Sequence, residues 1–113
     1  MNTNSKNINI DLKDILKIVE ESVLSCYGII SFTSKEGASN RKNQKKGKIE
    51  EGVTIHRYLN QTFSIDIYVA LSSEVKITET LRECQKIVSY NINKKYPHKC
   101  LSINVFATDI KSI

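Results

Sequence analysis

Long apolar stretches are absent from this sequence of 113 residues. A helix that crosses a bilayer needs roughly 20 consecutive apolar residues, and no run here approaches that length. The first residues, Met1–Lys6, also lack the apolar core of a secretory signal peptide. We therefore expect a protein that stays in the cytoplasm and does not insert directly into a membrane.

Cysteine and histidine are scarce as well. The three cysteines, Cys26, Cys84 and Cys100, are an odd number and include no Cys-x-x-Cys pair, which argues against a disulfide framework or a zinc ribbon. Reduced and mostly buried thiols are the simpler interpretation. The two histidines, His56 and His98, have no serine, cysteine or carboxylate at a spacing that by itself implies a nucleophile or a metal site. The sequence thus predicts no metal site.

Glycine-rich and paired-acid motifs are missing too. The four glycines are too dispersed to form a loop that cradles a phosphate. They are Gly28, Gly37, Gly47 and Gly52. Adjacent acids such as Glu20 and Glu21 fit a solvated surface better than a pair of acid and base catalysts, which need separate environments. We therefore expect no enzyme, no catalytic residue and no cofactor.

The net charge of +5 is concentrated in one segment. Of the 17 lysines and arginines, six lie in residues 35–48 beside a single anion, so the rest of the chain holds 11 cations and 11 anions. Residues 34–51 are rich in Gly, Ser, Asn and Lys, and we expect a mobile basic loop there. A solvated loop is the simpler hypothesis, although Lys42, Lys45 and Lys46 could attract an anionic lipid or nucleic acid.

Two segments have the apolar periodicity of amphipathic helices. From Asp11 to Cys26 the apolar positions recur at helical spacing, and Gly28 follows, where a residue without Cβ readily ends a helix. A second segment with this spacing runs from about Thr78 to Lys95, and Pro97 stops it.

Elsewhere, apolar and polar residues alternate as they do in β-strands. The predicted strands are residues 29–33, 53–59, 63–71 and 101–108, with residues 8–10 as a candidate for a short edge strand. A short turn after residue 59 joins two of them into an antiparallel hairpin. The order (β)-α-β-β-β-α-β predicts one α+β domain over residues 1–113, with a mostly antiparallel sheet of about four strands and both helices on one face. Residues 1–7 are expected to be flexible.

The strand alternation places several aromatic and polar side chains on the sheet face that the helices leave open. They are His56, Tyr58, Tyr68 and Phe106, together with Asp66 and Asn104. Aromatic rings on an open sheet can stack on RNA bases while a basic loop holds the phosphates. The same rings also stabilise cross-strand pairs or fill a protein interface, and the sequence lacks the glycine-aromatic signature of an RNA-recognition motif. An ordinary sheet face or a protein interface is the first hypothesis, and RNA binding is the second.

The C-terminal half contains motifs of a known family. They are the strand Phe63–Leu71, the helical segments Ile77–Glu79 and Leu81–Val88, and the final strand Leu101–Ile110. Near the N-terminus, Gly28 and Ile29 stand where the family usually has Gly-Val. Together these motifs resemble the alkaline shock protein family of bacterial envelope stress-response proteins.

The resemblance covers most of the chain except residues 34–51. The chain departs from the family at Ser72–Glu74 and Tyr96–His98, where a glycine is common, and these departures concern local turns only. The resemblance implies a non-enzymatic cytoplasmic binding or scaffold protein, linked to cell-envelope homeostasis or stress response. It also implies self-association and a membrane-anchored protein partner that holds the chain at the inner face of the cell membrane. The alternative is an RNA-binding module.

Overall fold

Two α-helices and four β-strands make up the part of the chain that the computed structural model describes, residues 9–34 and 52–112. In chain order the elements are α1 (Leu12–Leu24), β1 (Ile29–Phe32), β2 (Val53–Arg57), a short 3-10 helix η3 (Leu59–Gln61), β3 (Phe63–Ser72), α3 (Ile77–Lys95) and β4 (Cys100–Lys111). Neither of these helices combines the length and the apolar composition that a membrane-spanning helix needs.

Strand β3 is the centre of the sheet. β4 pairs with β3 in parallel along its whole length. The opposite edge of β3 is shared by two shorter antiparallel strands, because β2 pairs with residues 63–67 and β1 with residues 69–71. Two of the three pairings in the described sheet are therefore antiparallel, whereas the longest one is parallel.

Helix α3 explains why β4 runs parallel to β3. Its 19 residues extend about 28 Å, close to the roughly 33 Å of the ten-residue strand β3. The helix carries the chain back to the beginning of β3, so that β4 starts beside Phe63 and follows the same direction. A helical crossover of this kind is the usual connection between parallel strands.

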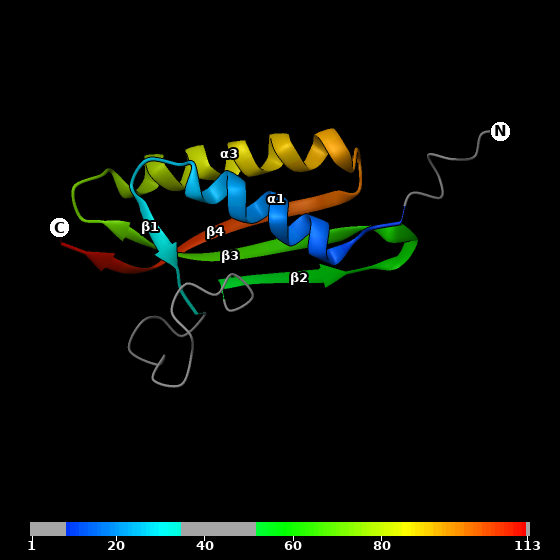
Figure 1. The fold of residues 1–113 in the computed structure, drawn as a ribbon, viewed down its shortest axis with the longest axis horizontal. Helices are drawn as coiled ribbons and strands as arrows, with labels where there is room; N and C mark the ends of the chain where they lie inside the picture. Colours follow the sequence, from blue (N-terminus) through cyan, green and yellow to red (C-terminus); the bar gives the residue numbers. More distant parts are fainter. Residues whose placement is uncertain (1–8, 35–51, 113) are drawn as a thin grey trace.

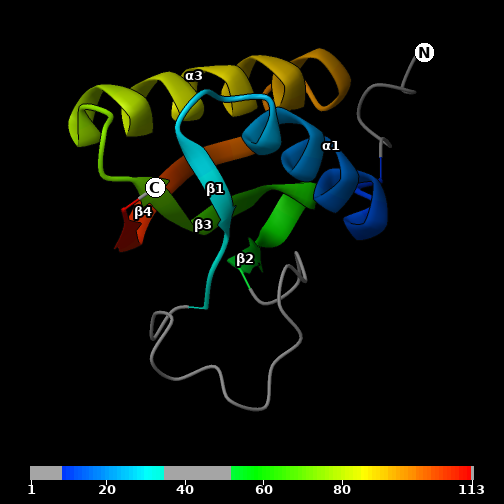
Figure 2. The same cartoon turned by 60° about the vertical axis from the view of Figure 1, so that its left-hand side comes forward.

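Both helices lie on the same face of the sheet (Figure 1), and Figure 2 shows this two-layer arrangement from another side. Fully buried apolar side chains from α1, β3 and α3 fill the space between the layers. They are Ile15, Val19 and Val23, then Ile65, Ile67, Val69 and Leu71, then Cys84, Val88 and Ile92. The predicted α+β class, the element order and the placement of both helices on one face are confirmed.

Asp11 caps the start of α1, and Gly28 allows the backbone turn that follows its end. The Asp11 carboxylate accepts hydrogen bonds from the backbone N–H groups of Lys13 and Asp14, at 3.1 and 3.4 Å, and so caps the helix. Gly28 has a φ of 96°, and a Cβ atom there would lie 2.8 Å from Cγ1 of Val75. Both its conformation and its surroundings require a residue without a side chain.

Strand β2 ends at Arg57, two residues earlier than the alternation predicts. The reason is the tight turn that follows, in which Asn60 and Gln61 have positive φ values of 65° and 60°. The backbone N–H of Tyr58 donates to the carbonyl of Thr62 at 2.8 Å and closes this turn. The predicted hairpin is present, with Tyr58 just beyond its first strand.

The candidate edge strand at residues 8–10 is wrong for its described residues, because Asn9 and Ile10 belong to no strand. The backbone N–H of Ile10 instead donates to the Gln61 side-chain oxygen at 3.2 Å. Residues 1–7, predicted to be flexible, lie outside the described residues. So does the predicted basic loop, except for Ser34, which is buried.

Candidate functional site

The predicted site residues meet on the open face of the sheet, the face turned away from both helices. Strand register places Asp66 of β3 beside Thr54 of β2 and Asn104 of β4. Two residues earlier in β3, Ser64 is paired with His56. Because alternate residues of a strand share a face, these side chains lie opposite the buried apolar positions of β3.

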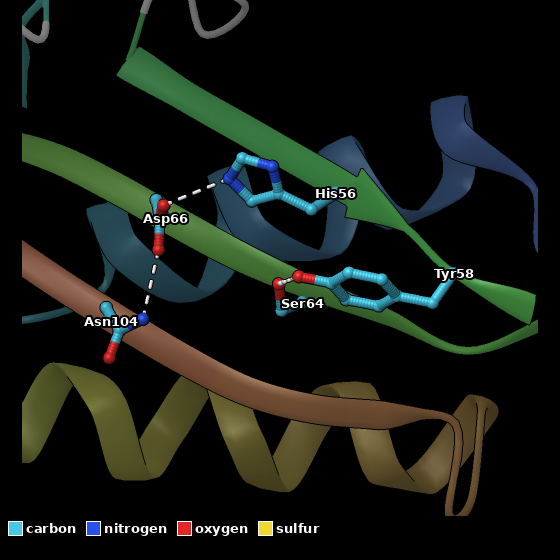
Figure 3. A network of polar contacts seen from close by, with 5 residues as sticks. All are labelled: His56, Tyr58, Ser64, Asp66 and Asn104. Atoms are coloured by element: carbon cyan, nitrogen blue, oxygen red, sulfur yellow. Dashed lines mark hydrogen bonds and ion pairs between the residues drawn. The ribbon is translucent and has the colours of Figure 1, made fainter.

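Asp66 links the three strands through both of its carboxylate oxygens. Oδ2 lies 3.1 Å from Nε2 of His56, and Oδ1 accepts a hydrogen bond of 3.0 Å from Nδ2 of Asn104. Figure 3 shows this chain of contacts running across β2, β3 and β4. Asp66 therefore has a partner at each oxygen, as expected of a carboxylate that holds a structure together.

Tyr58 extends the polar contacts toward the start of β3. Its hydroxyl lies 3.1 Å from Oγ of Ser64, which is buried. The ring reaches back over the sheet from the end of β2 (Figure 3). Half of the Tyr58 side chain remains exposed, so its ring offers an apolar surface while its hydroxyl already has a partner.

The two remaining predicted aromatics stack on each other. The rings of Tyr68 and Phe106 have centroids 5.2 Å apart and planes inclined by 19°. Tyr68 is almost completely buried, whereas Phe106 is 43% exposed. Among the predicted aromatic residues of this face, Phe106 and Tyr58 thus provide the accessible apolar surface. The ring of Tyr68 packs against the ring of Phe106.

Among the predicted open-face residues that the structure describes, Asp66 is the one carboxylate, and none is a lysine or arginine. The predicted cations Lys42, Lys45 and Lys46 lie outside the described residues. Their position relative to the open face therefore stays a prediction.

Sequence reasoning missed three hydroxyls around the site. Ser64 has the same strand parity as Asp66 and Tyr68, and that alternation would have identified it. The other two are the hydroxyls of Thr33 and Thr108, which contact each other. Thr33 directly follows β1, and Thr108 lies in β4. No sequence signal connects these two threonines, because they meet only through the packing of distant strands.

A second polar cluster joins the start of α1 to the end of α3. The hydroxyl of buried Tyr96 donates to Oδ2 of Asp14 at 2.7 Å, and Nζ of Lys95 lies 3.2 Å from the same oxygen. The hydrogen bond from Tyr96 lowers the pKa of Asp14. Burial, aided by this contact, raises the pKa of Tyr96 to about 12. The cluster thus connects two helices.

The thiols are held in their neutral form. Burial raises the pKa of Cys84 and of Cys26, and it raises the pKa of Cys100 to about 11. A reactive cysteine needs the opposite shift, because the thiolate is the nucleophile. Within residues 9–34 and 52–112, no three potential ligands among His, Cys, Asp and Glu gather as a metal would require.

A groove of about 760 Å³ lies between α1 and α3. Its polar lining residues include Ser22, Asn91, Lys94 and Lys95. Asn91 donates to the Ser22 hydroxyl at 2.8 Å, and Lys95 pairs with Asp14. Ser22, Asn91 and Lys95 therefore already have partners within the fold.

The model of the alkaline shock protein 23 family, which is described as having a cell envelope-related function, matches residues 1–112. The chain belongs to this alkaline shock protein family. The membership confirms the resemblance that the motifs in β3, α3 and β4 indicated. The match includes residues 34–51, where the motifs showed no resemblance.

Two relatives of this alkaline shock family chain come from bacteria, and each is named as an uncharacterized protein. Protein YloU of Bacillus subtilis is 24% identical over 113 residues, spanning 98% of this chain and 93% of the relative. Protein Spy1614 of Streptococcus pyogenes serotype M6 is 25% identical over 114 residues, spanning 97% and 93%. The similarity therefore extends over nearly the whole length of each protein.

Solved structures share the fold at low sequence identity. A MamM-CTD variant superposes with a TM-score of 0.54 at 14% identity, covering 89% of this chain and 99% of that one. A copper form of another MamM CTD variant also gives a TM-score of 0.54, at 13% identity and with the same coverage. At such identities the likeness concerns the fold alone.

Proposed function

We propose that this member of the alkaline shock protein family is a non-catalytic binding or scaffold protein that acts in cell-envelope homeostasis or stress response. It associates with itself and with a protein partner through the open face of the sheet or a free strand edge. The observation that carries the proposal is the open face, which neither helix covers and on which Tyr58 and Phe106 are 52% and 43% exposed.

The polar contacts of this face favour its burial in a protein interface. Buried polar groups are costly only when they lose their hydrogen-bond partners. Asp66 holds contacts with His56 and Asn104, and Tyr58 holds one with Ser64, so these contacts survive when a partner displaces water. The two exposed rings supply the apolar area, and aromatic residues are enriched at interfaces.

The proposed location is the cytoplasm, at the inner face of the cell membrane. The cell envelope-related function of the family supports a place near the membrane. Because neither described helix suits a membrane span, a membrane-anchored partner would hold the protein there.

Sedimentation velocity over a concentration series tests self-association through the open face. We expect the wild type to form species larger than a monomer, and the double variant Tyr58→Ser with Phe106→Ser to remain monomeric. The matched control is Leu24→Ser with Tyr27→Ser, which removes two apolar side chains that are 50% and 87% exposed elsewhere. A strictly monomeric wild type that also crosslinks to no protein in cells would contradict the proposal.

RNA binding is a second candidate, favoured by the exposed rings of Tyr58 and Phe106 on a sheet face. It predicts crosslinking to single-stranded RNA and an affinity that falls steeply with salt. Neutralising Lys42, Lys45 and Lys46 should then weaken binding and reduce its salt dependence. Crosslinking that recovers no RNA would dismiss this function.

A further inference from the structure

Strand β4 has a long edge on the side away from β3. It extends over 12 residues, and β3 is its only strand partner within residues 9–34 and 52–112. A strand edge presents a row of backbone N–H and C=O groups, which are a template for another strand. β2 also has an outer edge, but that strand has only five residues.

A side-chain amide already occupies part of this edge. Nε2 of Gln85, in α3, donates to the backbone carbonyl of Ile103 at 2.6 Å. The amide N–H thus takes the place that the backbone N–H of an added strand would take. Since alternate residues direct their peptide groups to the same edge, Val105 and Ala107 also present their backbone groups on this side.

Helix α3 forms the other wall of a groove along this edge. Figure 3 shows α3 running beside β4 on the side away from β3. Gln85 divides the groove into two sections of about 390 and 290 Å³. Ile103 lies in the first section, whereas Val105 and Phe106 lie in the second. A strand edge beside a helix is the geometry in which β-strand addition also gives pockets for alternate side chains.

The charges on α3 are divided between its two sides. Arg82 and Lys86 are exposed, line the groove at β4, and form no ion pair within the described part of the chain. No aspartate or glutamate lines either section of that groove. Glu79 and Glu83 instead line a separate hollow beside Tyr27. The groove therefore attracts acidic rather than basic side chains.

A second copy of the chain fits this groove poorly. Symmetric pairing of two β4 strands would bring two α3 helices together, with Arg82 and Lys86 of both copies facing one another. The last part of β4 offers one acid, Asp109, and it already pairs with Lys111 at 3.7 Å. Like charges facing each other across an interface oppose association.

We infer that the groove between β4 and α3 binds an extended acidic segment of a partner protein, which adds to β4 as a fifth strand. Its backbone N–H groups displace Gln85 from the Ile103 carbonyl and bond along Val105 and Ala107. Its carboxylates pair with Arg82 and Lys86. The inference rests on the proposed binding function. Its surface adjoins the open face at Asn104 and Phe106, which also line the second section of the groove.

The probe is a fluorescent peptide with alternating valine and glutamate, titrated by anisotropy against the full chain. Replacing Arg82 and Lys86 by glutamine should weaken binding about tenfold, equivalent to about 1.4 kcal/mol, because two exposed ion pairs are lost. The matched control is Lys13→Gln with Lys17→Gln, an exposed pair at the same spacing on α1. This control should bind like the wild type. A peptide with glutamine in place of glutamate should bind as weakly as the Arg82 and Lys86 variant.

Amide hydrogen exchange, followed by NMR, tests strand addition directly. Saturating peptide should slow exchange at Val105 and Ala107, and a peptide N-methylated at alternate residues should not. Equal peptide affinity of the groove variant and the α1 control variant would overturn the inference, as would protection confined to β2 or to the open face. Dimerisation through β4 would overturn it as well.

The two proposals fail in different ways. If the chain self-associates but binds no acidic peptide, only the proposal of peptide binding in the groove is refuted. If the chain binds the peptide through Arg82 and Lys86 but stays monomeric, only the proposal of self-association through the open face is refuted.

Discussion

Replacing Tyr96 by phenylalanine removes a single hydroxyl from the cluster that joins α1 to α3. That hydroxyl donates to Oδ2 of Asp14 at 2.7 Å. The ring itself is retained in the variant and keeps its edge-on contact with Phe63, whose centroid is 6.0 Å away. The substitution thus isolates a hydrogen bond between residues that are 82 positions apart in the sequence.

The expected cost at neutral pH is about 1.5 kcal/mol. Hydrogen bonds to charged groups contribute about 1.5 to 3 kcal/mol, and the lower end applies because the Asp14 side chain is 23% exposed and keeps Lys95 at 3.2 Å. For a domain of this size, such a loss lowers the melting temperature by about 6 °C. The control Tyr90→Phe changes a ring that is 66% exposed, and its stability should stay within about 0.5 kcal/mol of the wild type.

The cost of Tyr96→Phe should depend on pH in a defined direction. The pKa of Asp14 is lowered in the folded protein, so the stability from its carboxylate is complete above the unfolded pKa, about 3.9. This contribution is lost as the pH falls through the lower folded pKa. The stability difference between wild type and variant should therefore be constant from about pH 7 to pH 5 and shrink below about pH 4.

Urea unfolding followed by circular dichroism measures this difference at about pH 7, 5 and 3.5. Equal midpoints of wild type and Tyr96→Phe at pH 7 would refute the reasoning. A difference that grows as the pH falls would refute it too.

At alkaline pH the stability contribution of Tyr96 should decrease as the pH rises, because its folded pKa is raised to about 12. The contribution of Tyr96 is complete below its unfolded pKa of about 10 and is lost as the pH rises through the folded value.

Three further predictions concern the core and the turns. Gly28→Ala should destabilise the fold by at least about 1 kcal/mol, because φ is 96° and the new Cβ would meet Val75; thermal unfolding measures this. Ile67→Ala removes a fully buried side chain from the central strand and should cost about 3 to 4 kcal/mol in urea unfolding. In thiol labelling near pH 8, the partly buried Cys100 should react before the fully buried Cys84, and both slowly, because burial raises both pKa values.

The candidate site shows how far strand alternation predicts a surface. His56, Asp66 and Asn104 were placed on one face from their parity alone, and they are in contact there. Parity could not show that Tyr68 is almost completely buried on that face while its stacking partner Phe106 stays exposed. Burial depends on neighbouring segments, and those are set by the fold rather than by the local pattern.

The sequence by itself determined the elements and the faces they bury. Both helices and the four strands follow from apolar spacing, which is a property of neighbouring residues. Gly28, which follows α1, and Pro97, which follows α3, marked the helix ends from their own backbone restrictions.

The tertiary structure alone decided which elements are neighbours. It placed β1 and β2 on one edge of β3 and set β4 parallel on the other. It also joined Gln85 to Ile103 beside a free strand edge. These contacts join residues far apart in the chain, and they form only when the whole core packs. The surfaces through which the protein is proposed to act are therefore properties of the assembled sheet and helices.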